Sequence, residues 1–423
     1  MRPIVTALLT VLACSAPAQI PPTEPTTDLA LHLSASTDGS GLIAVDPFTL
    51  ADRSATPLIQ IGRAAGNITS ALASLDGRRI AITTYEYGSP ALSRDLHISV
   101  FDAPTGELRS RFSPEVPVVV DDLSADGTRI YARTWPPRDA SAERLVLDAT
   151  NGKIIEREPA FAVRGDTIAS TTDRLIRREY RLIGQADPNA TAPRSVDVAA
   201  WDLRTGNELW RTSVPSLLAG EWRTGRIVDG VELRSRITPA LALRADGDQL
   251  AIVGGSADTI RTGAIWIIQA QTGRLVSQRS YSVASLLDRI FAPSVAAAKS
   301  LDESLTVNAM FSLDGQTLYA HARRTTVDEG GQERYLYLGM VAVAVSEAIV
   351  RGHDIKMETY WYENRIAWTR ASADGKWLYI FLERSRNAVP LGYFLRRVDA
   401  STLRVLSERP FDGHRHAFML APR

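Results

Sequence analysis

The amino-acid sequence predicts an all-β fold, a seven-bladed β-propeller made of four-stranded antiparallel blades. Three observations lead to this prediction. Two kinds of turn signal recur along the chain, and alternating apolar strands follow them, as in "SADGTRIYAR". The first segment lacks one strand of the repeat, and the chain ends on a strand that nothing follows.

The first turn signal is an Asp-Gly pair followed by two mostly polar residues and an apolar run. Asp-Gly suits the positive φ angles of a tight hairpin turn, so each copy predicts a hairpin between the first and second strands of a blade. The aspartates are spread around the ring, and we therefore expect them to shape turns rather than bind an ion. The copies are centred on Asp76, Asp126, Asp246, Asp314 and Asp374, with a degraded copy around Asp173.

The second turn signal is "PTGE", "TNGK", "RTGN" or "QTGR", with "ASTL" in the last unit. A third strand precedes each of these turns, such as "LHISVFD" or "AIWIIQ", and a fourth strand such as "LRSRFS" follows. Four antiparallel strands repeated at roughly 50 to 70 residues predict one propeller blade per unit.

The two ends of the chain are expected to close the ring together. "LALHLSAS", "GLIAVDPFTL" and "ATPLIQIG" correspond to the second, third and fourth strands of a blade without its first strand. The C-terminal "RHAFMLAPR" is an apolar strand. We expect it to join the N-terminal blade as the missing innermost strand, because an open sheet edge invites aggregation.

Residues 1–18 are predicted to be an export signal, with Arg2 before an apolar run that is too short to span a bilayer. Two cleavage sites remain open. "VLAC" resembles the bacterial lipobox, in which Cys14 becomes lipidated, whereas "APA" fits ordinary cleavage after Ala18. Residues 19–28 form a Pro/Thr-rich tether, and residues 29–423 form the propeller. The protein is therefore expected in the cell envelope as a lipoprotein, or periplasmic or secreted.

Composition excludes several function classes. Lys plus Arg and Asp plus Glu both number 48, so no net charge attracts nucleic acid or an anionic membrane surface. Membrane contact is expected only through a lipid anchor. Because Cys14 is the only cysteine, the mature fold has no disulfide, thiolate metal site or cysteine nucleophile.

The recurring S-x-D-G and D-x-x-T-G motifs resemble those of the YVTN-type family of seven-bladed propellers, over about residues 30 to 423. "AWDLRTGNELW", residues 200–210, also resembles the tryptophan-docking repeat of quinoprotein propellers, and only this copy carries the Trp. That resemblance implies that Trp210 packs neighbouring blades together. Propellers of this kind include binding proteins, lactonases and dehydrogenase subunits, so the fold leaves the function open.

The expected topology places the short turns on one face of the ring and the long connections on the other. Long irregular loops are expected at "LLAGEWRTGRIVDGVELRSR", "RRTTVDEGGQERY" and "ERSRNAVPLGY", and a binding site is expected on that face. The candidate ligand-binding residues are His321, Arg133 and Arg178, each placed at a similar depth in a second strand near the central channel. No catalytic motif, metal site or cofactor site is predicted.

The function expected from these observations is that of a non-catalytic binding or scaffolding module of the bacterial cell envelope, with an envelope protein as partner. The alternative is an extracytoplasmic propeller enzyme, a lactonase-like hydrolase or a dehydrogenase-type subunit, with its site at the mouth of the channel. In that case a small molecule would bind near the three candidate residues.

Overall fold

The computed structural model describes residues 30–36, 39–46, 48–51, 59–60, 67–74, 78–85, 96–124, 126–134, 143–159, 166–173, 177–184, 194–228, 230–256, 263–281, 303–327, 333–346, 349–354, 363–372, 374–386 and 389–411. Regular secondary structure in these ranges is entirely β-strand. The same ranges contain no helix of the length and hydrophobicity that crossing a membrane requires.

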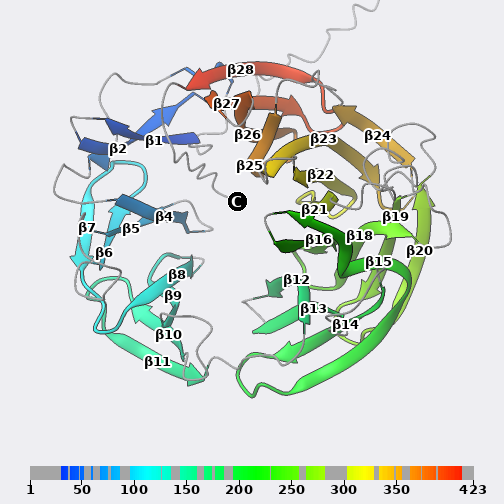
Figure 1. The fold of residues 1–423 in the computed structure, drawn as a ribbon. Coiled ribbons are helices and arrows are strands. Elements are labelled where there is room, and N and C mark those ends of the chain that lie inside the picture. Colours follow the sequence, from blue (N-terminus) through cyan, green and yellow to red (C-terminus); the bar gives the residue numbers. More distant parts are fainter. Residues whose placement is uncertain are drawn as a thin grey trace, which may run out of the picture.

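The described strands form seven blades arranged in a ring (Figure 1), which confirms the predicted all-β propeller of four-stranded antiparallel blades. Strand pairing joins blades four, five and six into one 13-stranded sheet. Blade one has three strands, as expected for the first segment: β1 (Ala30–Ser36), β2 (Gly39–Val45) and β3 (Ile59–Gln60). Blade two contains β4 (Asn67–Ala73), β5 (Arg79–Tyr85), β6 (Leu96–Asp102) and β7 (Leu108–Phe112). Blade three contains β8 (Val118–Leu123), β9 (Arg129–Thr134), β10 (Glu143–Asp148) and β11 (Ile154–Pro159).

Blades four to seven continue around the ring. Blade four contains β12 (Asp166–Asp173), β13 (Arg178–Gly184), β14 (Arg194–Asp202) and β15 (Glu208–Val228), and β16 (Val231–Thr238) follows it. Blade five contains β17 (Ala240–Leu243), β18 (Gln249–Ser256), β19 (Gly263–Gln269) and β20 (Leu275–Tyr281). Blade six contains β21 (Glu303–Phe311), β22 (Thr317–Val327), β23 (Glu333–Ala344) and β24 (Ile349–Asp354). Blade seven contains β25 (Glu363–Ala371), β26 (Trp377–Arg386), β27 (Val389–Asp399) and β28 (Val405–Phe411).

The Asp-Gly turn of blade three explains why the motif recurs. Asp126 Oδ1 accepts hydrogen bonds from Ser124 Oγ at 2.6 Å and from the Thr128 amide at 3.1 Å. Ser124 Oγ in turn accepts the Arg129 amide at 2.9 Å. The hydrogen bond from Ser124 and those from Thr128 lower the pKa of Asp126 to about 2. Of Asp126 and Gly127, only Gly127 takes positive φ, at 67°, so the aspartate closes the turn with its side chain rather than with its backbone.

The same Ser and Asp contacts recur at Ser312 with Asp314 and at Ser372 with Asp374. In blade five Arg244 replaces the serine, and its guanidinium holds Asp246 at 2.8 Å. Each of these aspartates serves its own turn, as the sequence predicted.

Apolar side chains fill most of the blade interfaces. One cluster joins blades two and three, a second joins blades four and five around Trp266 and Tyr180, a third joins blades five and six, and a fourth joins blades six and seven. This burial of facing apolar surfaces is the main source of the ring's stability.

Trp210 docks on the next blade, as the resemblance to quinoprotein propellers implied. Its indole Nε1 donates a hydrogen bond to the Ala270 carbonyl at 3.0 Å. A Cβ added at Gly273 would lie 2.5 Å from the Trp210 ring, so only glycine fits beneath it. Thr212 Oγ1 donates to the Gly273 carbonyl at 2.6 Å and completes the contact between blades four and five.

The last blade meets the first one, and Figure 1 shows β28 beside blade one. Arg409 Nη1 donates to the Leu50 carbonyl at 2.8 Å, and Ser407 Oγ donates to the Phe48 carbonyl at 3.3 Å. The Arg397 guanidinium lies 5.3 Å from the centre of the Phe48 ring. The predicted closing strand, from His416 onward, lies outside the described residues, as do residues 1–29 with Cys14.

Candidate functional site

Three stretches that were expected to be long loops form β-hairpins instead. Residues 217–236 were expected to be an irregular loop, but they belong to β15 and β16, which pair through Val228 and Val231. The sequence signal was present and overlooked, because Asp229-Gly230 between two valines is itself a hairpin signal. Gly230 takes the expected positive φ of 79°.

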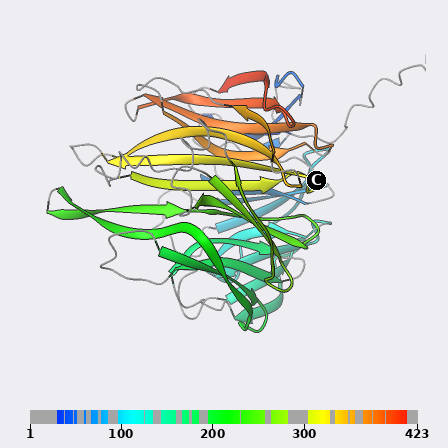
Figure 2. The same cartoon turned by 90° about the vertical axis from the view of Figure 1, so that its right-hand side faces the viewer.

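Two further stretches on this face are also strands rather than irregular loops. Residues 323–327 and 333–335 extend the β22/β23 hairpin, and residues 383–386 and 389–393 extend the β26/β27 hairpin. Figure 2 shows β15 and β16, in green, reaching beyond the rest of the ring on the side toward which the β22/β23 hairpin also extends. These three described stretches are therefore strand hairpins.

We name residues 217–238 the arm. Its base is held by two blades, since Leu217 and Leu218 pair with β18, and Ile237 and Thr238 pair in parallel with β21. Trp222 is only 6% exposed and belongs to the apolar cluster between blades five and six. The arm is thus fixed to the ring by both backbone and side-chain contacts.

The outer part of the arm projects past these anchors. Glu221 and Arg234 form a cross-strand ion pair at 2.9 Å, and Arg223 and Glu232 form another at 2.8 Å. Beyond them Ile227 is 69% exposed. In the described part of the chain the outer strands of the arm pair only with each other, so both edges present backbone groups for pairing.

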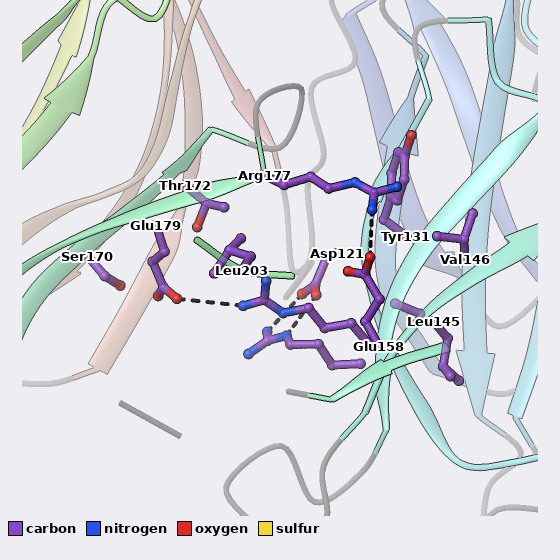
Figure 3. Close-up of a pocket in the computed structure, with 13 residues that line it drawn as sticks. Asp121, Tyr131, Leu145, Val146, Glu158, Ser170, Thr172, Arg177, Glu179 and Leu203 are labelled. Atoms are coloured by element: carbon purple, nitrogen blue, oxygen red, sulfur yellow. Dashed lines mark hydrogen bonds and ion pairs between the residues drawn. The ribbon is translucent and has the colours of Figure 1, made fainter. Parts of the chain in front are cut away.

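A second candidate site lies between blades three and four, where charged residues replace the apolar contacts of the two neighbouring interfaces. The pocket there has a volume of about 250 Å³, and Figure 3 shows its lining. The lining residues of this inter-blade pocket are Asp121, Tyr131, Ala132, Arg133, Arg144, Leu145, Val146, Glu158, Ser170, Thr172, Arg177, Glu179 and Leu203.

Two arginines of the pocket are locked by carboxylates. Arg133 donates to both oxygens of Asp121, at 2.7 and 2.8 Å, and this pairing raises the pKa of Arg133 above its usual range. Arg177 binds both oxygens of Glu156 at 3.1 Å and one oxygen of Glu158 at 2.5 Å. Burial raises the pKa of Glu158, because the charged form loses water there.

Arg144 is paired less well. Its Nη2 lies 3.6 Å from Glu179 Oε2, and Arg181 Nη2 holds the same oxygen at 2.7 Å. Two guanidinium groups therefore share one carboxylate oxygen. Burial lowers the pKa of Arg144, an effect that the charge of Arg133 reinforces.

The structure places the three predicted site residues in different blades and does not bring them together. Arg133 is the fifth residue of β9 and lines the inter-blade pocket. His321 is the fifth residue of β22, on the same side as Tyr319, which packs against blade seven. His321 thus faces the interface between blades six and seven rather than the mouth of the channel. Burial, together with the charge of Arg323, lowers its pKa to about 4.

The expectation that Arg178 lies at a similar depth was wrong. Arg178 is the first residue of β13 and so lies at the turn end of its blade. Arg178 lies on the same face of the sheet as Tyr180, which packs toward blade five and away from the pocket. The degraded turn signal after Asp173 has no glycine to mark the turn, so the sequence reading began the second strand too early.

Arg144, Glu158 and Glu179 were missed by sequence reasoning. Each lies in an alternating strand, where a single charged residue is usually solvated, and only the neighbouring blade makes it part of a pocket. Within the described ranges no group of three or more His, Cys, Asp or Glu side chains is placed to hold a metal ion. His414 and His416 lie outside those ranges.

Comparisons with known proteins give a likeness of shape. No family model and no curated protein matches the sequence. Hydrazine synthase of Kuenenia stuttgartiensis is similar with a TM-score of 0.39 and 13% identity over 75% of each chain. A eukaryotic initiation factor is similar with a TM-score of 0.44 and 10% identity, over 91% of this chain and 96% of that chain. Quinohemoprotein alcohol dehydrogenase from Comamonas testosteroni is similar with a TM-score of 0.38 and 12% identity, over 90% of this chain and 65% of that chain. The fold assignment rests on the strand pairing, and similarity at this level says nothing about activity.

Proposed function

We propose that the chain is an exported bacterial β-propeller that acts as a non-catalytic binding or scaffolding module in the cell envelope. The export signal supports the location, with Cys14 as lipid anchor or cleavage after Ala18. The recurring turns and the docked Trp210 support a place among the YVTN-type and quinoprotein-like propellers.

The arm is the observation that carries this proposal. It is anchored at its base by two blades and by Trp222, so its outer strands are preorganised, and a partner need not order them on binding. Its open strand edges suit pairing with an extended segment of a partner protein, and Ile227 offers an apolar anchor at the tip. The ion pairs along the arm keep its register and discourage self-association.

The enzyme alternative has lost its specific support. It required His321, Arg133 and Arg178 to converge at one end of the channel, and they lie in three blades at two different ends. We therefore propose a protein partner, bound across the face that carries the arm.

Shortening the arm tests the proposal. Replacement of residues 224–233 by Asn-Gly would join Arg223 to Arg234, which already face each other across the ladder, and would leave Trp222 in place. The shortened protein is expected to keep its melting temperature, because the described backbone of the deleted part pairs only within the arm. In its native host it should lose the partner proteins that co-purify with the intact chain. An unchanged set of partners would overturn the proposal.

A further inference from the structure

The interface between blades three and four is polar where its neighbours are apolar. Apolar clusters fill the interfaces on either side of it. Here the small apolar group Ile183, Ala199 and Trp201 lies within blade four alone, and six of the thirteen residues that line the pocket are charged. Partly exposed ion pairs such as Arg133–Asp121 and Arg177–Glu156 contribute little to stability. Stability alone therefore does not account for this interface.

The charges of the pocket fall into separate groups. Arg133 and Asp121 neutralise each other. Arg144 and Arg181 share the single carboxylate of Glu179, which leaves an excess of one positive charge. Arg177 faces both Glu156 and Glu158, which leaves an excess of one negative charge.

The two unbalanced groups are neighbours. Arg144 on β10 lies directly opposite Glu158 on β11 in the strand ladder. Arg144 has five N–H donors, and within the described residues its one partner is Glu179 at 3.6 Å. The pocket thus presents the guanidinium of Arg144, which has N–H donors left for a ligand, next to the carboxylate of Glu158, which belongs to the group with an excess negative charge.

We propose that the inter-blade pocket binds a free α-amino acid, with the ligand carboxylate on Arg144 and the ligand ammonium group on Glu158. An α-amino acid carries its ammonium and carboxylate groups on the same carbon, so it complements both side chains without adding net charge. A dianion such as phosphate would face Glu158, Glu179 and Asp121, and like-charge contacts in a partly desolvated site are costly. The lining has three arginines and three acidic residues, which fits a ligand of zero net charge.

Size and access agree with this ligand class. A volume of about 250 Å³ lies just below the range of roughly 300–1,000 Å³ that is typical of drug-sized ligands, so the pocket suits a small molecule. The pocket is open where the exposed Ser170 and Thr172 of β12 line it, and their hydroxyl groups are available to the ligand side chain.

Calorimetric titration of the full chain with L-alanine, L-serine and L-glutamine tests the proposal. Propanoate and isopropylamine are the matched controls, since each keeps one of the two charged groups of L-alanine. At least one amino acid is expected to bind, and both controls should bind at least tenfold more weakly than L-alanine if L-alanine is a ligand. Arg144→Gln and Glu158→Gln should each weaken amino-acid binding at least tenfold. Arg157→Gln, on the opposite side of blade three, should leave it unchanged.

Calorimetric melting of each variant without ligand separates binding from folding. Arg144→Gln should not lower the melting temperature, because it removes a poorly paired charge. Should it fail to fold, Arg144→Lys keeps the charge but loses the two-pronged geometry, and it should also bind at least tenfold more weakly. The proposal fails if no amino acid binds, if propanoate binds as tightly as the best-bound amino acid, or if neither pocket variant weakens binding. The arm-shortened protein should bind like the intact chain, so this test and that of the proposed function are independent.

Discussion

Substitution of Gly273 by alanine is expected to destabilise the ring at the contact between blades four and five. Gly273 has a φ of 73°, where an L-residue costs about 1–2 kcal/mol. The new Cβ would also lie 2.5 Å from the Trp210 ring. Overpacking of this kind costs about 1–3 kcal/mol. The total expected loss in the free energy of unfolding is therefore about 2–5 kcal/mol.

Gly375 provides the matched control. Its φ is 69°, and a Cβ there would meet nothing within 4 Å, so Gly375→Ala should show the backbone cost alone. Equilibrium unfolding in urea measures the free energy of unfolding of both variants, provided that its slope against urea concentration is unchanged. The double variant Gly273→Ala, Trp210→Ala should be less destabilised than the sum of the two single variants by about 1–3 kcal/mol, because without the Trp210 ring the new Cβ no longer overlaps it. If Gly273→Ala costs no more than Gly375→Ala, the docking account of Trp210 is wrong.

Three further predictions concern other parts of the ring. The pKa of His321 is about 4 in the folded protein against 6.5 in an unfolded chain, so the folded state binds fewer protons below pH 6.5. The free energy of unfolding should therefore fall by up to about 3 kcal/mol as the pH drops from 6.5 to 4. His321→Gln should remove this pH dependence from melting curves, and a variant with the same pH profile as the intact protein would contradict the prediction. Ser372→Ala removes the Oγ that holds both Asp374 and the Trp377 amide and should cost about 1–3 kcal/mol in urea unfolding, while a loss below 0.5 kcal/mol on the same scale would show that the turn closes without it. Deleting residues from His416 onward should lower the melting temperature and promote aggregation, and an unchanged melting curve would rule out closure by the C-terminal strand.

Repeated local signals made the blades predictable. Each Asp-Gly or Thr-Gly turn is formed by contacts within a few residues, such as those of Ser124 with Asp126, so the sequence contains all the information needed. The third strand predicted at "LHISVFD" coincides with β6 for the same reason. Trp210 was identifiable because its motif is also local.

The candidate sites depend on contacts between distant parts of the chain and were less predictable. Arg144 and Glu179 form one group only because blade four packs against blade three. The side on which Arg178 points depends on where its strand begins, and a missing glycine hid that point. The arm was the exception, because its hairpin could have been predicted from the sequence. Asp229-Gly230 is a hairpin signal, but the length of the stretch led to the prediction of a loop.

The most direct test of the account is photo-crosslinking in the native host with a crosslinking residue at Ile227, at the tip of the arm. The matched control is Ile155, an isoleucine on the outer strand β11 that is 52% exposed, against 69% for Ile227. The account predicts a reproducible crosslink to one envelope protein from position 227 and none to that protein from position 155. Equal crosslinking from both positions, or none from position 227, would contradict it.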